Sequence, residues 1–208
     1  MKNVSKICFT LMLAGSAASL HAAERPHAKN SSKHPACDVH VAQVYDWGSI
    51  PVEQLDPFGP TNLPPKEETF TVTCAEPSLF TLHIADEDAD SVPESFGRQF
   101  FFGLGLHDHR PVGAYALQLT ELAADGHTHN VVMARKEGDS WVPQESRLRP
   151  GSIIRFTNGS GIPDWDHQQI RQLTGKLVAT GLTVMRSELP ASGSVPFRGH
   201  ITIMPGSP

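Results

Sequence analysis

The chain has 208 residues, with 17 basic and 22 acidic side chains and a formal net charge of −5 at pH 7. This length suits one domain of ordinary size. The mildly acidic balance argues against a general nucleic-acid-binding protein, because such proteins gather basic residues on one face.

The first 23 residues have the pattern of a secretory signal peptide. Two lysines precede an apolar stretch over Ile7–Leu13, and small residues follow it as far as Ala23. The apolar stretch is too short to span a bilayer as a helix. We expect cleavage after Ala22 or Ala23 and export to the periplasm; a buried N-terminal helix is the alternative.

Residues 24–36 are polar, include two prolines and show no apolar alternation. A segment of this composition cannot bury enough apolar surface to order itself. We therefore expect a flexible N-terminal segment that precedes a single folded domain over residues 37–208.

Export would leave two cysteines, Cys37 and Cys74, because Cys8 lies in the predicted signal peptide. Two widely spaced cysteines in an exported chain favour one disulfide. Closing a loop of this size would stabilise the fold by roughly 4 kcal/mol in the chain-entropy model. A reduced pair, or a metal ion shared by both thiolates, remains the alternative, although the spacing has no C-x-x-C pattern.

The stretch Cys37–Tyr45 has strand-like alternation that places Val39 and Val41 on one face, and a shift near its end suggests a bulge. Asp46–Gly48 is expected as a turn. The stretch Ser49–Glu68 contains five prolines, so it suits edge strands and excludes a helix of any length.

Further strands are predicted from alternation and from flanking turn residues, over residues 69–75, 79–85, 113–122, 131–134, 140–142, 151–158 and 174–185. Residues 107–111 are expected as a turn, and Asp125–Gly126 is a hairpin-type turn sequence. Residues 168–173 have a pattern that suits a helical turn. The last strand, Val195–Met204, places four apolar residues on one face: Val195, Phe197, Ile201 and Ile203.

Many short strands, frequent glycine and proline, and little helical periodicity predict an all-β fold, a β-sandwich with an immunoglobulin-like arrangement.

Two H-x-H pairs are candidate metal ligands, His107 with His109 and His127 with His129, because alternate residues of a strand face the same way. The acidic loop Asp86–Asp90 offers carboxylates for calcium. Both pairs lie in predicted loops and the acidic loop has no EF-hand spacing, so solvated turn residues are the simpler interpretation. We expect no metal and no other cofactor.

No nucleophile motif such as G-x-S-x-G is present, so we expect a non-enzymatic protein. Gly103 and Gly105 lack the third glycine and the helix of a dinucleotide site and are expected in a kinked strand. Three tryptophans suit either a sugar-stacking platform or core packing: Trp47, Trp141 and Trp165.

The order of several short motifs resembles the chaperone–usher pilins, specifically the β-fimbrial subunit-like group. The matching pieces follow the predicted signal peptide and Cys37, and they are Tyr45–Gly48, Thr73–Pro77, Phe102–Gly105, Val112–Tyr115 and Phe197–Ile203. The resemblance covers residues 37–204 and depends on the order and spacing of the pieces together.

This resemblance implies an incomplete immunoglobulin-like sandwich that lacks its last strand. A periplasmic pilus chaperone would lend a strand during folding, and after passage through the usher a neighbouring pilin subunit would supply it in a cell-surface fimbria used in adhesion. The disulfide would fasten the first strand to the second. The donor-strand groove would be lined by Phe197, Ile201 and Ile203, with Val39 and Val41 on the opposite side.

One departure from the pilin pattern concerns residues 24–36. Polymerising pilins carry an alternating apolar extension before the first cysteine, and this segment has none. It predicts a subunit that accepts a strand but donates poorly, as at a fibre tip. The alternative function is a free periplasmic or secreted β-sandwich that binds a metal ion or a carbohydrate.

Overall fold

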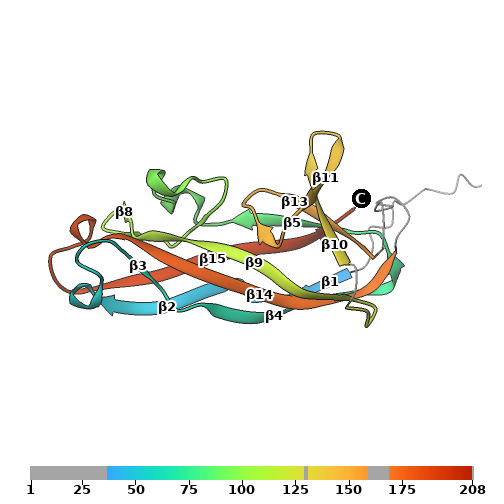
Figure 1. Cartoon of the computed structure of the whole chain (residues 1–208), viewed down its shortest axis with the longest axis horizontal. Coiled ribbons are helices and arrows are strands. Elements are labelled where there is room, and N and C mark those ends of the chain that lie inside the picture. Colours follow the sequence, from blue (N-terminus) through green and yellow to red (C-terminus); the bar gives the residue numbers. More distant parts are fainter. Residues whose placement is uncertain (1–36, 129–130, 159–168, 208) are drawn as a thin grey trace, which may run out of the picture. The chain divides into compact units, whose positions relative to one another are not determined.

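The computed structural model describes residues 37–128, 131–158 and 169–207, and the two large sheets that they form are antiparallel (Figure 1). The predicted signal peptide (residues 1–23) and N-terminal segment (residues 24–36) lie outside the described residues. The predicted all-β sandwich is confirmed. Its immunoglobulin-like character remains a prediction.

The larger sheet has seven strands, with β14 running between β4 and β9 (Figure 1). Along the sheet the order is β1 (Cys37–His40), β4 (Lys66–Ser78), β14 (Ile170–Met185), β9 (Gly113–Ala124) and β12 (Arg147–Leu148), while β3 (Pro60–Asn62) pairs with β14 and β6 (Phe102–Gly103) with β9.

The second sheet has six strands in the order β11 (Ser140–Gln144), β10 (Val131–Glu137), β13 (Ile153–Asn158), β5 (Thr81–Asp86), β15 (Ser194–Gly206) and β2 (Val44–Pro51). A small hairpin joins β7 (Leu106–His107) to β8 (Arg110–Pro111). Four single 3₁₀ turns complete the described elements: η1 (Val52–Gln54), η2 (Ala89–Ser91), η3 (Glu94–Phe96) and η4 (Arg186–Glu188).

The core lies between the two large sheets. It is formed by alternate residues of the strands, because successive side chains of a strand point to opposite faces. In β15 every second residue from Val195 to Ile203 is buried, and β4 does the same with Phe70, Val72 and Cys74. Each large apolar side chain that is removed from water in this way stabilises the fold by roughly 1.5–3 kcal/mol.

An aromatic cluster fills the space between the sheets near β2. Tyr115 from β9 lies 5.6 Å from Tyr45 and 5.5 Å from Phe102, measured between ring centroids, and Trp47 lies 5.8 Å from Tyr115. Burial raises the pKa of both tyrosine hydroxyls well above its ordinary value. These tyrosines are therefore neutral parts of the core.

Two local predictions are wrong. Asp46–Gly48 is not a turn, because β2 continues through it and pairs with β15. Asp46 and Gly48 each have a partner on β15, whereas Trp47 between them has none and forms a bulge. Residues 170–173 are not helical, since β14 begins at Ile170 and bonds to β4 from its first residues. Tertiary pairing overrides local pattern in both places.

The chain also changes sheets where the sequence suggested a bulge. β1 ends at His40 in the larger sheet, and β2 begins at Val44 in the smaller one. The predicted single strand Cys37–Tyr45 is therefore two strands separated by a crossover. Because β2 begins only after this crossover, the crossover sets how much of one edge of β15 is covered by β2.

Candidate functional site

The two edges of β15 are covered by different strands over different lengths. β2 pairs with residues 194–200 on one edge, and β5 pairs with residues 201–206 on the other. On the β2 side the last backbone hydrogen bond runs from the Ile201 N–H to the Gln43 carbonyl at 2.9 Å. No strand in the described part of the chain pairs with that side beyond this point, and we call this stretch the open edge.

Backbone groups at the open edge can be assigned from strand geometry. Successive residues of a strand direct their N–H and C=O groups to opposite edges. Because the Ile201 N–H points to Gln43 on the β2 side, the N–H and C=O of Ile203 point to the same side. Thr202 and Met204 direct theirs to β5. The open edge therefore presents a donor and acceptors for a further strand.

β1 lies beside the open edge without pairing with it. The two strands are in contact, yet β1 forms its ladder with β4 in the opposite sheet, where Val39 lies opposite Val72. The chain crosses from the larger sheet to the smaller one between His40 and Val44, so it reaches β15 only at β2. The arrangement leaves apolar residues of both sheets next to an unpaired strand edge.

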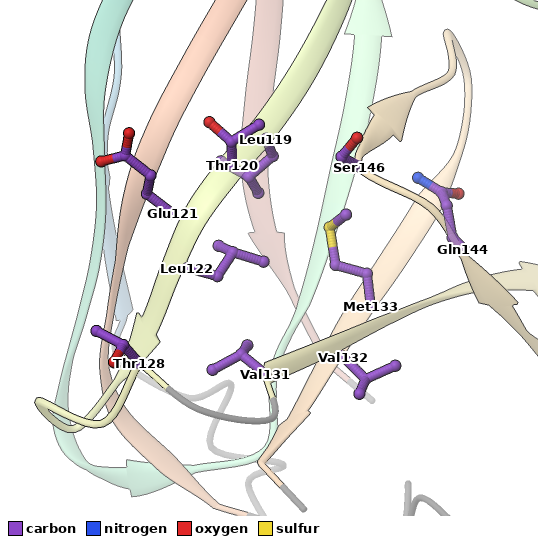
Figure 2. Close-up of a pocket in the computed structure, with 10 residues that line it drawn as sticks. All are labelled: Leu119, Thr120, Glu121, Leu122, Thr128, Val131, Val132, Met133, Gln144 and Ser146. Atoms are coloured by element: carbon purple, nitrogen blue, oxygen red, sulfur yellow. The ribbon is translucent and has the colours of Figure 1, made fainter.

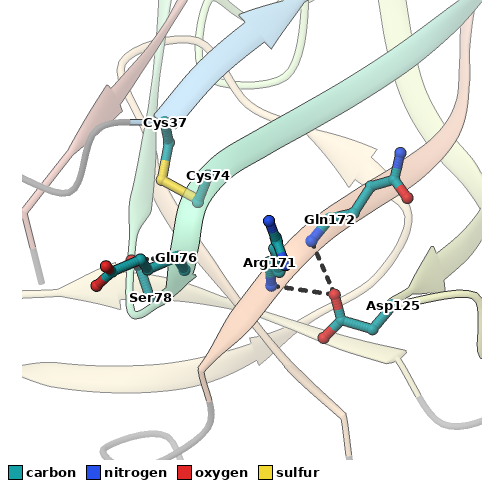
Figure 3. Close-up of a disulfide and its surroundings, with 7 residues drawn as sticks. All are labelled: Cys37, Cys74, Glu76, Ser78, Asp125, Arg171 and Gln172. Carbon is teal, nitrogen blue, oxygen red and sulfur yellow. Dashed lines mark hydrogen bonds between the residues drawn. A yellow bond between two sulfur atoms is a disulfide. The ribbon is translucent and has the colours of Figure 1, made fainter.

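The predicted disulfide is confirmed, and it holds β1 in this position. Cys37 and Cys74 lie directly opposite each other, with their Cα atoms 3.9 Å apart, and both are buried (Figure 3). Close by, the Asp125 carboxylate accepts hydrogen bonds from the backbone N–H groups of Arg171, at 3.0 Å, and Gln172, at 2.8 Å. The end of β9 is thereby fixed to the start of β14.

The predicted groove residues fall into two groups. Ile201 and Ile203 lie in the half of β15 that carries the open edge, and Val39 and Val41 are half-buried against the core nearby. Phe197 lies instead in the half that pairs with β2 and is fully buried. These placements do not test strand binding, which remains a prediction.

On the β5 side of β15, the acidic loop is used internally. The Asp86 carboxylate accepts hydrogen bonds from the N–H groups of Gly103, at 2.9 Å, and Asp88, at 3.0 Å. Asp88 in turn accepts a hydrogen bond of 2.8 Å from the His200 N–H and lies 2.7 Å from its ring Nδ1. Burial raises the pKa of Asp86 to about 6, and its two hydrogen bonds oppose that rise.

The histidines that the sequence offered as metal ligands do not form a metal site in the described residues. Among residues 37–128, 131–158 and 169–207 no group of three or more His, Cys, Asp or Glu side chains is placed to hold a metal ion. His107 ends β7, His109 lies in the turn between β7 and β8, and His127 follows β9. His129 lies outside the described residues.

The tryptophans that are described do not form a platform. Trp47 is on β2 and Trp141 on β11, which are the opposite edges of the six-stranded sheet. The Trp141 ring is covered by the guanidinium of Arg155, 4.0 Å from its centroid. Trp165 lies outside the described residues.

A hollow that the sequence did not reveal lies between β9 and β10 and has a volume of about 710 Å³. Figure 2 shows Leu122 from β9 and Val131 and Met133 from β10 directed into the space between the two strands. A bulge in β9 around Glu121, whose φ is 52°, opens the strand here. The register shift lies opposite Gly175 of β14, where a Cβ would come within 2.9 Å of the Thr120 carbonyl oxygen, and no local pattern in β9 signals it.

In the described residues no helix is both long enough and apolar enough to cross a membrane. Comparison of the chain with protein-family models, with curated proteins and with solved structures finds no match.

Proposed function

We propose that this chain is a non-enzymatic structural subunit of a chaperone–usher fimbria that accepts a β-strand from a partner at the open edge of β15. The partner would be a periplasmic pilus chaperone during assembly and a neighbouring subunit in the fibre. Export and a cell-surface location belong to the same proposal, through the predicted signal peptide.

The observation that carries this proposal is the combination of an unpaired strand edge with an apolar face. Ile201 and Ile203, which are buried in the core, lie along the open edge, and β1, fixed by the disulfide, contacts β15 and carries the half-buried Val39. An added strand would gain backbone hydrogen bonds from the edge and side-chain contacts from the alternate positions. An unprotected edge of this kind also exposes a free subunit to aggregation, which gives a reason for a chaperone.

Expression in the periplasm, alone and together with a pilus chaperone, tests the proposal. We expect a stable one-to-one complex on size-exclusion chromatography with the chaperone, and degradation or aggregation without it. A well-behaved monomer that unfolds cooperatively and ignores the chaperone would overturn the proposal.

Hydrogen exchange on the complex would locate the added strand. We expect the Ile203 amide to exchange much more slowly in the complex than in the free chain, because it faces the open edge. The Thr202 amide, which faces β5, is the internal control and should change little. Unchanged exchange at Ile203 in a stable complex would place the chaperone elsewhere.

We also propose that the subunit donates a strand poorly, since residues 24–36 lack apolar alternation. Purified subunit released from its chaperone should then fail to polymerise with itself. Efficient self-polymerisation through residues 24–36 would contradict this part of the proposal and leave strand acceptance intact.

A further inference from the structure

A polar hollow of about 500 Å³ lies beside β10 and the turn that leads into β13. Its walls come from the end of β10, from the Arg149–Ser152 turn and from Gln99 in the preceding loop. This volume is in the range of sites that hold small organic ligands, roughly 300–1,000 Å³. The open edge belongs to β15, so this hollow is a different place on the molecule.

Basic side chains line the hollow although the chain as a whole is acidic. Arg135 forms an ion pair with Glu137 on its own strand, so its charge is largely balanced. Lys136 and Arg149 form no ion pair with any described carboxylate. Two basic residues with no ion-pair partner among the described carboxylates therefore line one small space, which favours a ligand that carries negative charge.

The Arg149 guanidinium lies beside an aromatic ring. It lies over Phe100, 5.0 Å from the ring centroid, and the residue is half-buried. A guanidinium attracted to a ring in this way still has N–H groups for hydrogen bonds, and its planar fork matches the two oxygens of a carboxylate or a sulfate. Little side-chain freedom is then lost on binding.

The remaining walls suit hydroxyl groups. Gly138 and Gly151 contribute backbone without a side chain, and the exposed Gln99 amide offers both a donor and an acceptor. Ile153 provides a partly apolar side wall. A ligand that combines one oxyanion with several hydroxyls meets all of these features.

We infer that this hollow is a binding site for an acidic sugar unit, with Lys136 and Arg149 contacting its carboxylate or sulfate. The Gln99 amide and the backbone at the two glycines hydrogen-bond its hydroxyls. The inference stands apart from strand acceptance, because it involves a different part of the six-stranded sheet.

Isothermal titration of the full exported chain tests this, with the chaperone complex as the sample if the free chain aggregates and the chaperone alone as the blank. The probes are a glucuronate-containing disaccharide, a sulfated disaccharide and a neutral disaccharide of the same size. We expect measurable binding of at least one acidic probe, weakened at high salt, and none of the neutral one. The acidic probe that binds identifies the oxyanion.

Two substitutions in the hollow and one outside it locate the binding. Lys136→Ala and Arg149→Gln should each weaken binding by about tenfold, as expected for the loss of a charge-assisted hydrogen bond. Arg171→Ala removes an exposed charge in the other sheet and should leave the affinity unchanged. Thermal melting confirms that each variant is folded.

Three results would overturn the inference. They are the absence of binding of both acidic probes at millimolar concentration, equal binding of the neutral probe, and an equal loss of affinity in Arg171→Ala. None of them bears on the chaperone experiment, so this site and the proposed function can fail separately.

Discussion

At the scale of single residues, Gly199 on β15 has no room for a side chain. A Cβ atom there would overlap the Tyr115 ring and would lie 2.7 Å from the Gly103 carbonyl oxygen. Gly199→Ala must therefore displace the aromatic cluster or β6, and we expect it to lower the free energy of unfolding by about 2 kcal/mol or more. Urea unfolding followed by tyrosine and tryptophan fluorescence measures this.

Gly59→Ala is the matched control for that change. A Cβ at Gly59 meets no atom within 4 Å, and the residue is not in the left-handed region of φ. The free energy of unfolding should then move by less than about 0.5 kcal/mol. Equal effects of the two substitutions would show that the overlap at Gly199 is relieved without cost.

Asp86 gives the fold a pH dependence of unusual sign. Its pKa is raised from 3.8 to about 6 in the folded state, mainly by burial, so the folded chain holds this proton over a range where the unfolded chain has released it. The contribution of Asp86 to stability is therefore fully present below pH 3.8 and is lost as the pH rises through 6.

We expect the Asp86→Asn variant to lack this component. The difference in free energy of unfolding between wild type and variant should change steadily from pH 4 to pH 7, in favour of the variant at higher pH. Urea titrations at several pH values measure it. Asp90→Asn, at a fully exposed carboxylate that is only 3.7 Å from Arg98, provides the control. A pH-independent difference for Asp86→Asn would contradict the burial argument.

At the scale of elements, the disulfide joins two neighbouring strands across 37 positions of sequence. Replacing both Cys37 and Cys74 by alanine should lower the free energy of unfolding by about 4 kcal/mol, because the unfolded chain regains the entropy of an open loop. β1 should lose the most protection, since it is short and β4 is its single partner among the described strands.

Hydrogen exchange separates the local effect from the global one. In the double-alanine variant the amides of residues 37–40 should exchange faster than those of β14, relative to the oxidised wild type. Treatment of the wild type with a reductant should reproduce the result. Unchanged protection of β1 would mean that strand pairing alone holds it beside the open edge.

Local alternation was sufficient to predict most strands and their buried faces. β4 and β15 follow the period of two closely, and the same pattern placed Ile201 and Ile203 on the core face. Pairing between distant segments was not predictable in this way, because an alternating strand has two edges and the pattern does not say what covers each. The crossover after His40 and the bulge at Trp47 both arise from such pairing.

The hollows were also not predictable from local sequence, because distant segments line them. The polar hollow brings together Gln99, Lys136 and Arg149, which are far apart in the sequence. The sequence did offer one usable signal, since β10 ends in a charged stretch, Arg135–Glu137, next to a glycine turn. That signal gives a location but no ligand, because the charge balance depends on which carboxylates come close.

At the scale of the whole molecule, a strand supplied in the same chain should replace the chaperone. We expect a version with a flexible linker and an alternating apolar segment fused after Pro208 to be soluble and monomeric without a chaperone. The segment would fill the open edge of its own β15 by the pairing described for a partner strand. Each kcal/mol gained should raise the melting temperature by about 2–4 °C for a domain of this size.

The control is a fusion of identical composition in which the apolar residues stand in adjacent pairs. Strand alternation directs neighbouring side chains to opposite faces, so such a segment cannot place all of its apolar residues toward the core. It should therefore leave the melting temperature and the chaperone dependence unchanged. If both fusions behave alike, added apolar content is sufficient and a specific strand site at β15 is not needed; if only the alternating fusion stabilises the chain, the open edge accepts a strand in register with Ile201 and Ile203.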